Sequence, residues 1–592
     1  MTARPIRIAN FSGYLGDRLS GLTEALTGDP IDVAVGDYLA EITLAALAAR
    51  SRSGHPGYVD YFLDQIRPHL SLIARTGVKV VTNAGGFDPA ALATALRLEA
   101  DAAGVVLSVA YVEGDNITDE LDALQQQGHR FEHLDTGSDL RSWDADILTA
   151  NAYVGGWGIA AALREGADLV VCGRVTDASL VTGPAAWWHG WEATQWGELA
   201  GAVVAGHIIE CGPQAVGGNF SGFTEVPGTL RPGFPIAEIA ADGSSAITKH
   251  AGHDGYVTTD TVTAQLLYEI QGPRYLNPDV TVHLEGVSVQ QSEPDRVLVA
   301  GAAGSPPPPT TKVAVFGRIG YQVVHSVFVT APQVDEKVRH LESQLRADLP
   351  SDVDLDVTRL GTAAVDPRTQ WDATVCVRVM ATATAREALL DFNLGRQLRS
   401  LYLQSVPGFF HDGASTLVSE PRPRIDYWPA LLSAPMVPHA VVLPDGRREA
   451  IATSAVTTVP SQLPEQNPPA VPDSGPTRVV ELGALVHARS GDKGGNSNVG
   501  LWVKDRAHWP WLQGTLTVDE LRSLMPEAKD LDIVRHEFAH LGAIHFVLRG
   551  LLGTGGSSNL RVDQVGKAVG EYLRAKYVVV PEALFDHTGP SL

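Results

Sequence analysis

Glu210 and Cys211 follow an apolar segment that carries a histidine, His207, in its last turn. Residues four apart in a helix share a face, so His207 and Cys211 can form the pair of a covalent thiol catalyst. The alternative is that Cys211 is a small buried thiol near a helix end. Glu210 offers a second chemistry, because burial raises the pKa of a carboxyl and suits it to move protons beside a carbonyl. The residue types leave these alternatives open.

Polar residues in neighbouring segments can serve the same reaction. Side chains able to donate a hydrogen bond to an oxyanion are those of Gln214, Asn219, Asn83 and Ser12. Asn151 is a further polar candidate for substrate binding. Arg174 can hold a carboxylate, while Asp177 can orient Arg174 or act as a second base. We therefore expect these residues to line one site.

The segment RSGDKGGN at residues 489–496 follows an apolar run and contains two cations. Backbone N–H groups of such a turn, together with Arg489 and Lys493, can hold a phosphate or a carboxylate. The spacing is not that of a Walker A loop, because glycine follows Lys493 where serine or threonine is required. The alternative is a tight hairpin turn with a solvated pair of Asp492 and Lys493.

A third constellation, His536-Glu537-x-x-His540, has the spacing of zinc proteases. In those enzymes both histidines lie one helical turn apart and the glutamate is the base. The apolar spacing predicts a helix over residues 534–552, with His536 and His540 nearly opposite its apolar stripe. A third ligand does not follow at the expected spacing. The favoured interpretation is a chance match, and we expect no metal.

The elements that position these residues follow from a repeating pattern in the first 220 residues. Short apolar runs end in glycine or small polar residues at 6–9, 31–35, 78–81, 105–112, 147–150 and 169–172. Helices are predicted over residues 89–102, 157–165 and 199–209. Such alternation indicates βαβ units and a buried parallel sheet, which binds ligands at the carboxyl ends of its strands. One such end is commonly a turn or helix cap, but six together favour a shared cleft.

The pattern of predicted strands and helices changes in the rest of the chain. Strands are predicted over residues 280–284, 312–316, 322–329, 374–381, 479–488, 499–503 and 577–580, and helices over 335–349 and 385–404. The predicted fold class is α/β, with four segments: a parallel-sheet βαβ domain at 1–228, an α+β middle domain at 229–420, a Pro-rich linker at 421–476 and a small C-terminal α+β domain at 477–592.

Composition narrows the class of protein. The 592 residues carry a formal net charge of −23, which disfavours nucleic acid as a partner. The three cysteines are far apart, so neither a disulfide framework nor a cysteine metal knuckle is indicated. A G-x-G-x-x-G fingerprint is missing from the first loop, so no dinucleotide cofactor is expected. The N-terminus lacks an apolar signal region, and we expect a soluble cytoplasmic protein.

Several longer stretches resemble the acyclic terpene utilisation protein A (AtuA) family, among them NFSGYLGDR, VTNAGG and HIIECGPQAVGGNFSGF. The late stretch LVHARSGDKGGNSNVGLWV resembles the small ferredoxin-fold domain that some members carry at the C-terminus. The resemblance covers nearly the whole chain except the Pro-rich linker. It implies a place in the catabolism of citronellol-, geraniol- or leucine-type branched acids, alongside acyl-CoA carboxylases and enoyl-CoA hydratases. The paired His536 and His540 depart from the family pattern.

The resemblance and the candidate residues together predict an enzyme acting on a branched acyl-CoA or related carbonyl acid by hydration, dehydration or C–C lyase chemistry. Glu210 is the expected acid or base, and Asp177 and Cys211 are further catalytic candidates. One alternative is a non-catalytic partner subunit of an acyl-CoA carboxylase or hydratase complex. Another is a zinc hydrolase that uses His536 and His540. We expect no cofactor and no membrane partner, and we expect a homo-oligomer.

Overall fold

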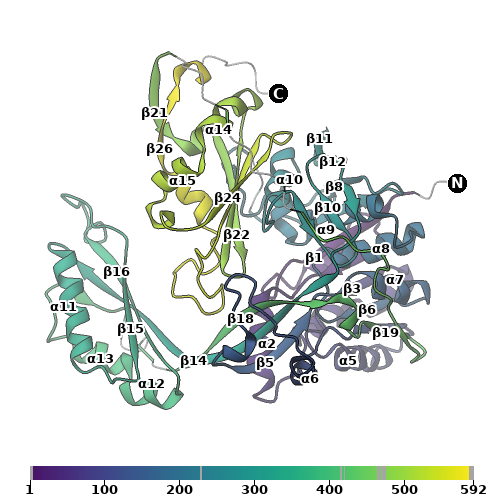
Figure 1. The fold of residues 1–592 in the computed structure, drawn as a ribbon, viewed down its shortest axis with the longest axis horizontal. Helices are drawn as coiled ribbons and strands as arrows, with labels where there is room; N and C mark the ends of the chain where they lie inside the picture. Colours follow the sequence, from purple (N-terminus) through teal and green to yellow (C-terminus); the bar gives the residue numbers. More distant parts are fainter. Residues whose placement is uncertain are drawn as a thin grey trace. The chain divides into compact units, whose positions relative to one another are not determined.

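The computed structural model describes residues 4–226, 228, 230–413, 417–418, 420–461, 463, 468–469 and 475–585. The chain forms two compact units. The first comprises Met1–Ser142, Leu148–Phe316 and Tyr427–Leu592, and the second comprises Trp143–Ile147 and Gly317–Asp426. The fold class predicted from the sequence is confirmed: the architecture is mixed α/β, with a parallel sheet in the N-terminal region (Figure 1).

A parallel sheet in the order β1-β2-β3-β6-β4 forms the centre of the first unit. Its strands are β1 (Ile6–Ser12), β2 (Val33–Gly36), β3 (Lys79–Thr82), β6 (Leu169–Cys172) and β4 (Val109–Glu113). Strands β2 and β6 are buried at every residue, as expected for a sheet covered on both faces. Five of the six predicted apolar runs are thereby confirmed as parallel strands.

Antiparallel strands extend this sheet on both sides. Beyond β1 lie β7 (Pro235–Ile239), β8 (Ser245–Lys249), β12 (Arg296–Ala300) and β11 (Ser288–Glu293), and beyond β4 lie β19 (Ala440–Val442) and β20 (Arg448–Ala450). Within the described residues the sheet has eleven strands. The carboxyl ends of the parallel strands meet at one edge, which carries the candidate site.

Three predicted helices are present: α5 (Pro89–Ala102), α7 (Trp157–Arg164) and α9 (Trp196–Ile209). The structure also contains α2 (Glu41–Ser51), α8 (Ser179–His189) and α10 (Thr259–Leu266). Helix α5 begins at a cap in which Asp88 accepts a hydrogen bond from the Ala91 N–H over 3.0 Å. Helix α9 is buried at every residue from Leu199 to Ile209, so it is a core helix rather than a surface one.

The sixth predicted run forms strand β5 (Asp146–Ala152), but its expected place in the parallel sheet is wrong. Strand β5 pairs with the long strand β14 (Thr310–Thr330). The sequence predicts two strands where β14 is continuous, because Gly317 and Gly320 interrupt the apolar pattern without ending the strand. The end of β5 still reaches the site edge, through a bridge between Asn116 and Asn151.

The second unit is an antiparallel sheet covered by helices. It contains part of β14 with β15 (Asp354–Leu360), β16 (Thr374–Ala383) and β17 (Phe409–Phe410), and helices α11 (Val334–Ala347), α12 (Arg386–Phe392) and α13 (Leu394–Ser400). The single helix predicted over residues 385–404 is wrong. Asn393 has a φ of 49°, which ends α12, and its side chain accepts from the Arg396 N–H to begin α13.

The C-terminal part of the first unit has its own apolar core. It contains a four-stranded antiparallel sheet in the order β22-β23-β25-β24 and a two-stranded pair, β21 with β26. The strands are β21 (Thr477–Glu481), β22 (Val486–Lys493), β23 (Asn496–Val503), β24 (Ile533–Phe538), β25 (Ala543–Leu548) and β26 (Tyr577–Pro581). The helices are α14 (Trp509–Thr515), α15 (Val518–Leu524) and α16 (Val569–Arg574).

The helix predicted over residues 534–552 is wrong, because the segment forms the hairpin of β24 and β25. His536 therefore lies opposite His545 on the partner strand, not one helical turn from His540. Glu537 accepts hydrogen bonds from Arg535 over 2.6 Å and from Gln513 over 2.7 Å. Within the described residues, no group of three or more histidine, cysteine, aspartate or glutamate side chains is arranged to hold a metal. The protease-like spacing thus occurs without the protease geometry.

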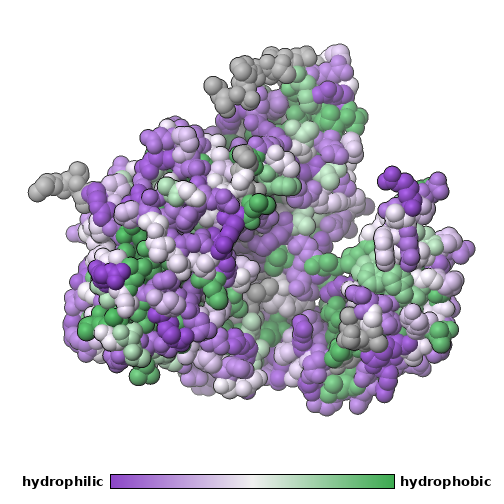
Figure 2. All heavy atoms as spheres, turned by 180° about the vertical axis from the view of Figure 1, so that it is seen from behind, coloured by the Kyte–Doolittle hydropathy of each residue, from purple (hydrophilic) through white to green (hydrophobic). Residues whose placement is uncertain are grey.

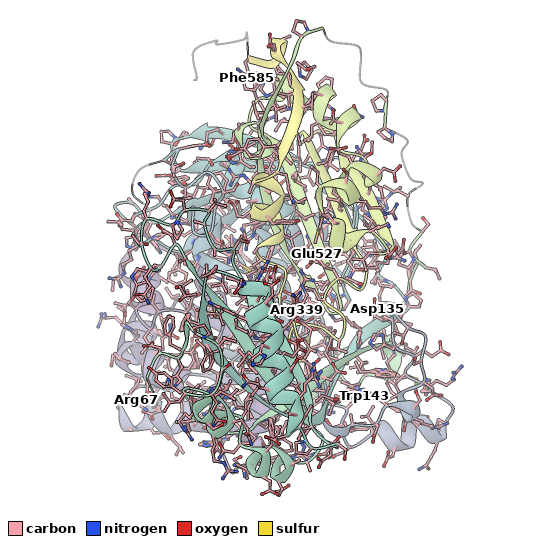
Figure 3. All side chains as sticks on the ribbon, turned by 90° about the vertical axis from the view of Figure 1, so that its left-hand side faces the viewer. Arg67, Asp135, Trp143, Arg339, Glu527 and Phe585 are labelled. Atoms are coloured by element: carbon pink, nitrogen blue, oxygen red, sulfur yellow. The ribbon has the colours of Figure 1, made fainter. Side chains whose placement is uncertain are left out.

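The glycine-rich segment at 489–496 forms a strand end and a hairpin turn. Strand β22 runs to Lys493, and Asn496 begins β23. The Asn496 carboxamide donates to Asp135, which is labelled in Figure 3, over 2.8 Å. Within the predicted linker, β18 (Arg422–Ser433), β19 and β20 are regular strands. Much of the proline-rich stretch at 460–476 lies outside the described residues.

Hydrophilic side chains predominate on the face drawn in Figure 2, with hydrophobic side chains scattered between them. A helix long and apolar enough to span a membrane is not found among the described residues.

Candidate functional site

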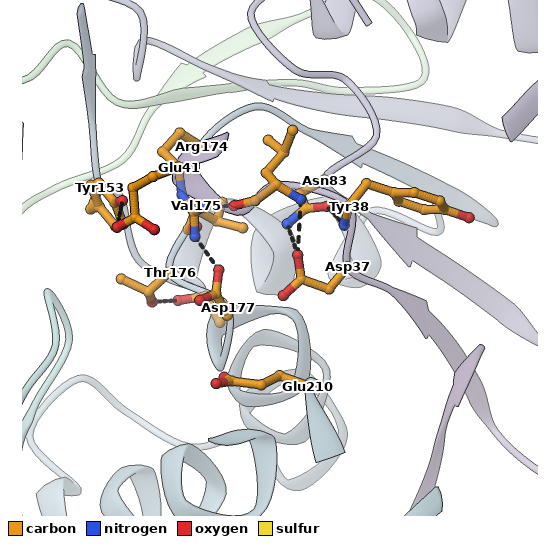
Figure 4. Close-up of polar contacts among 12 residues, drawn as sticks. Asp37, Tyr38, Glu41, Asn83, Tyr153, Arg174, Val175, Thr176, Asp177 and Glu210 are labelled. Carbon is orange, nitrogen blue, oxygen red and sulfur yellow. Dashed lines mark hydrogen bonds and ion pairs between the residues drawn. The ribbon is translucent and has the colours of Figure 1, made fainter. Parts of the chain in front are cut away.

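The ends of strands β2 and β3 bring Asp37 and Asn83 together. The Asn83 carboxamide nitrogen donates to a carboxylate oxygen of Asp37 over 2.7 Å, and its oxygen accepts from the Tyr38 N–H over 2.7 Å (Figure 4). Both side chains are buried. Asn83 is predicted from the sequence to donate a hydrogen bond to the substrate. In this structure its carboxamide is instead hydrogen-bonded within the protein and holds Asp37 in place.

Asp37 belongs to a group of carboxyls around one guanidinium. Burial and the nearby charge of Asp177 raise the pKa of Asp37 well above its ordinary range, with a smaller contribution from Glu210. The charge of Arg174 opposes this rise. Carboxyls that share a buried site in this way favour retention of a proton, which is the condition for acid–base chemistry near neutral pH.

Arg174 follows β6 and is 1 % exposed. Its Nε donates to the Val175 carbonyl over 2.8 Å, one terminal nitrogen donates to the Leu39 carbonyl and the other to Asp177. The guanidinium also lies over the Tyr153 ring, 4.4 Å from its centroid. The carboxylate that Arg174 holds is thus the protein's own Asp177 (Figure 4). Arg174 and Asp177 form one unit, with Asp177 the more exposed member at 29 %.

Asp115 holds the backbone of Arg174 in place. One of its oxygens accepts the Arg174 N–H over 2.8 Å and the Asn151 carboxamide over 2.8 Å. The carboxamide oxygen of Asn151 accepts in turn from the Thr149 hydroxyl over 2.7 Å. Asn151 and Asp115 are buried at 0 % and 2 % exposure. Asn151 therefore lies under the site, where it fixes the backbone of Arg174.

A second charged group adjoins the Tyr153 ring. Glu41, at the start of α2, accepts from the Tyr153 hydroxyl over 2.9 Å and pairs with Lys312 of β14 over 3.0 Å. Burial raises the pKa of Glu41, but Lys312, Lys493 and Arg174 outweigh it and the pKa falls below its ordinary value. Sequence reasoning missed this group. An acidic residue in the first turn of a helix and a lysine in a strand are both commonplace, so neither gave a signal.

Glu210 ends helix α9 and is 7 % exposed. One carboxylate oxygen lies 3.2 Å from Nδ1 of His207, and the other has no hydrogen-bond partner. Burial raises the pKa of Glu210, against the charge of His207 and a hydrogen bond from it. The charge of Asp177 adds to the rise and that of Lys493 opposes it. In place of the predicted pairing with Cys211, His207 contacts Glu210, whose other oxygen stays without a hydrogen-bond partner.

Cys211 lies next to Glu210 in a setting that disfavours its thiolate. Burial raises the pKa of the thiol well above its ordinary value, and the charges of Glu210 and Glu269 add to that rise. Covalent catalysis needs the thiolate, so these surroundings support the alternative of a structural thiol.

Gly13 packs against the backbone of Glu210 and Cys211. A Cβ at Gly13 would lie 2.6 Å from the Cys211 carbonyl carbon and 2.8 Å from the Glu210 carbonyl oxygen. We expect Gly13→Ala to lower stability by about 1–3 kcal/mol, because the added methyl must displace backbone. Gly197→Ala is the matched control, since nothing lies within 4 Å of its Cβ. Urea unfolding of both variants tests this, and equal midpoints would contradict the close packing.

Residues of β1 hold the two sides of the site together. The Asn10 carboxamide donates to the Ser12 carbonyl over 3.0 Å and to the Glu210 carbonyl over 3.2 Å. The Ser12 hydroxyl lies 3.1 Å from the Tyr14 carbonyl and 3.2 Å from the Asp37 carbonyl. Ser12 therefore supports the strand end in this structure.

The C-terminal domain contributes to the same region within one chain. Arg489 donates to the side-chain oxygen of Gln214 and, over 3.4 Å, to the Asn219 carbonyl. Its guanidinium lies over the Tyr268 ring, 4.2 Å from the centroid. Three predicted residues from two distant segments thus meet, and Asn219, with a φ of 54°, contributes its backbone carbonyl to Arg489.

Lys493 links this region electrostatically to the strand ends. Burial acts to lower the pKa of Lys493, but Tyr275 and Glu269 outweigh it and raise the pKa. Lys493 also opposes the rise in the pKa of Glu210 and lowers that of Glu41. The charge of Lys493 therefore acts on both carboxyls.

The sequence of this chain was compared with models of known protein families, with curated proteins and with solved structures. The family model described as "Acyclic terpene utilisation family protein AtuA" matches residues 6–443. The chain belongs to the AtuA family. Residues 480–579 match the AtuA ferredoxin-like domain, which is the C-terminal α+β domain described above. No curated protein and no solved structure matched the chain.

The AtuA match spans the parallel sheet with its strand-end carboxyls, and the ferredoxin-like match spans Arg489 and Lys493. The family description associates the chain with the use of acyclic terpenes. It names no reaction, so the roles of the site residues follow from their geometry.

Proposed function

We propose that this AtuA protein is an enzyme of branched-chain or acyclic terpenoid acid breakdown. In this proposal it transfers a proton beside the carbonyl of an acyl-CoA or related carbonyl acid. The reaction class is hydration, dehydration or C–C bond cleavage, all of which pass through charge on that carbonyl. The observation that carries the proposal is the group of Asp37, Asp177 and Glu210, in which Arg174 holds Asp177 and the charge of Asp177 raises the pKa of the two buried carboxyls.

Glu210 is the proposed acid or base. Its raised pKa lets it hold a proton nearer neutral pH, and one of its oxygens has no partner in the protein. His207 contacts the other oxygen and orients the carboxyl. The favoured substrate position is therefore beside the unpartnered oxygen.

Asp177 and Lys493 are proposed to serve the other side of the reaction. Arg174 holds Asp177, which is the most exposed carboxyl of the group and can accept a proton from water or a hydroxyl. The raised pKa of Lys493 keeps it charged, so it can stabilise an oxyanion. Asp37, Asn83 and Arg174 act in this proposal as positioning residues.

The test is to incubate the purified protein with branched acyl-CoA thioesters that are saturated, unsaturated or 3-hydroxylated, and to record their masses. Gain or loss of one water supports hydratase or dehydratase chemistry, and a cleaved fragment supports lyase chemistry. If every thioester is recovered unchanged, while the protein co-purifies with a carboxylase or hydratase, the partner-subunit alternative replaces the enzyme.

A homo-oligomer and a cytoplasmic location remain predictions from the sequence. Size-exclusion chromatography with light scattering tests the first, and cell fractionation tests the second.

A further inference from the structure

A cavity lies between the loop at 217–223 and residues 488–490 of strand β22. Its volume is about 380 Å³, within the range of small-molecule sites. Lys567, which precedes α16, and Gly570, in the first turn of α16, also line it. All of these residues belong to one compact unit.

Arg489 places a buried positive charge in this wall. It is 4 % exposed, and its side-chain hydrogen bonds go to the neutral Gln214 and to the Asn219 carbonyl. Its Nε has no hydrogen-bond partner. Among the described residues, no carboxylate lies within ion-pair distance of Arg489. A buried guanidinium without a counter-ion is costly, and in a chain with a net charge of −23 its isolation is notable.

Lys567 adds a second cation to the same wall. Its amino group donates to the Tyr268 hydroxyl over 2.5 Å, and the Tyr268 ring lies beneath Arg489. In the described part of the chain Lys567 also lacks an ion-pair partner. The acidic residue of the cavity wall, Glu571, is paired with Arg574 over 2.7 Å. The cavity wall therefore carries two cations that form no direct ion pair with a carboxylate of the described residues, although the charge of Lys567 acts on the buried Asp492.

Aromatic surface accompanies these charges. Phe223 also lines the cavity. It is 61 % exposed, so most of its ring is not packed against the protein. Phe220 lines the same wall and is buried against His487, with ring centroids 4.9 Å apart. Cations beside an open aromatic face form a pattern that binds a nucleotide, since phosphates pair with Arg and Lys while a base stacks on the ring.

We propose that this cavity binds a nucleoside diphosphate, with the phosphates at Arg489 and Lys567 and the base on Phe223. The identification of that nucleotide as the end of a coenzyme A thioester rests on the proposed function. The site assigns one role to the C-terminal domain, because strand β22 supplies Arg489 to the cavity and Lys493 to the carboxyl group. In this proposal one strand, β22, contacts both the nucleotide end of the substrate and the region of its reacting carbonyl.

The test is calorimetric titration of the full-length protein with ADP, coenzyme A and inorganic phosphate. We expect ADP and coenzyme A to bind, and Lys567→Met to weaken both by about tenfold or more through the loss of a charged contact. Phe223→Ala should weaken ADP and leave phosphate unaffected. Lys529→Met removes an exposed lysine that does not line the cavity, and it should bind as the unaltered protein does.

The proposal is overturned if ADP does not bind, or if Lys567→Met binds ADP as tightly as the unaltered protein. Phosphate that binds as tightly as ADP, with Phe223→Ala unchanged, would make this a site for free phosphate and also overturn it. Turnover of thioesters without ADP binding removes the cavity proposal and leaves the proposed function standing. ADP binding without turnover of any thioester leaves the cavity proposal standing and removes the proposed function.

Discussion

Replacing Glu210 with glutamine is expected to lower turnover by about 10²- to 10⁴-fold, the usual contribution of a positioned acid or base. Glutamine has nearly the same size and can keep the contact with His207, but it cannot carry the proton. The pH dependence of the unaltered enzyme provides a second readout. If Glu210 acts as a base, turnover falls as the pH decreases through its raised pKa; if it acts as an acid, turnover falls as the pH increases through that value.

The matched control is Glu192→Gln, which makes the same chemical change at an exposed glutamate. It should leave turnover and pH dependence unaltered. Steady-state kinetics and circular dichroism on both variants separate loss of chemistry from loss of fold. Full activity of Glu210→Gln with an unchanged pH profile would remove Glu210 from the mechanism.

Replacing Arg174 with methionine is expected to lower stability by about 3–5 kcal/mol, the typical result of removing one partner from a buried ion pair. Methionine fills much of the space of the arginine stem but cannot donate to Val175, Leu39 or Asp177. Arg447→Met is the informative control. Arg447 contacts carboxylates of Glu165, Asp445 and Glu449, yet it is 56 % exposed, so its loss should leave stability nearly unchanged.

The loss at Arg174 should also depend on pH. Arg174 opposes the rise in the pKa of Asp37, so its removal raises that pKa further. A carboxyl whose folded-state pKa is raised favours folding at low pH, and this contribution is lost as the pH rises through the raised value. The variant should therefore be closer to the unaltered protein at pH 5 than at pH 8. Urea unfolding at both values measures this, and an equal loss at each would show that charge is not the cause.

The parallel core was predictable because its strands are short, continuously apolar and bounded by glycine or small polar residues. Strands β2 and β6 meet these conditions fully. Strand β5 meets them too, yet it pairs with β14, since a local apolar run does not specify the neighbour of a strand. The prediction of a helix where β24 and β25 form a hairpin failed for a related reason. The apolar residues of this segment fit a helical spacing as well as an alternating one.

The candidate site was predictable where polar residues directly follow strands. Arg174 and Asp177, which follow β6, are paired. Gln214, which follows helix α9, meets Arg489 of β22 across a long sequence separation. Sequence could not separate side chains that face a ligand from those that support them. Asn83 directly follows β3 and Asn151 lies near the end of β5, where a binding residue is expected, but their carboxamides are engaged with Asp37 and Asp115. That distinction depends on hydrogen-bond partners that only the folded chain brings together.

The most direct test of proton transfer beside a carbonyl is exchange of the substrate's α-hydrogen. Branched acyl-CoA thioesters are incubated with the protein in D₂O, and deuterium in the recovered thioester is measured by mass spectrometry. We predict incorporation at the α-carbon with the unaltered protein and with Glu192→Gln, and a loss of about 10²-fold or more with Glu210→Gln. No incorporation with any thioester, or equal incorporation with Glu210→Gln, would contradict the assignment of proton transfer to this site.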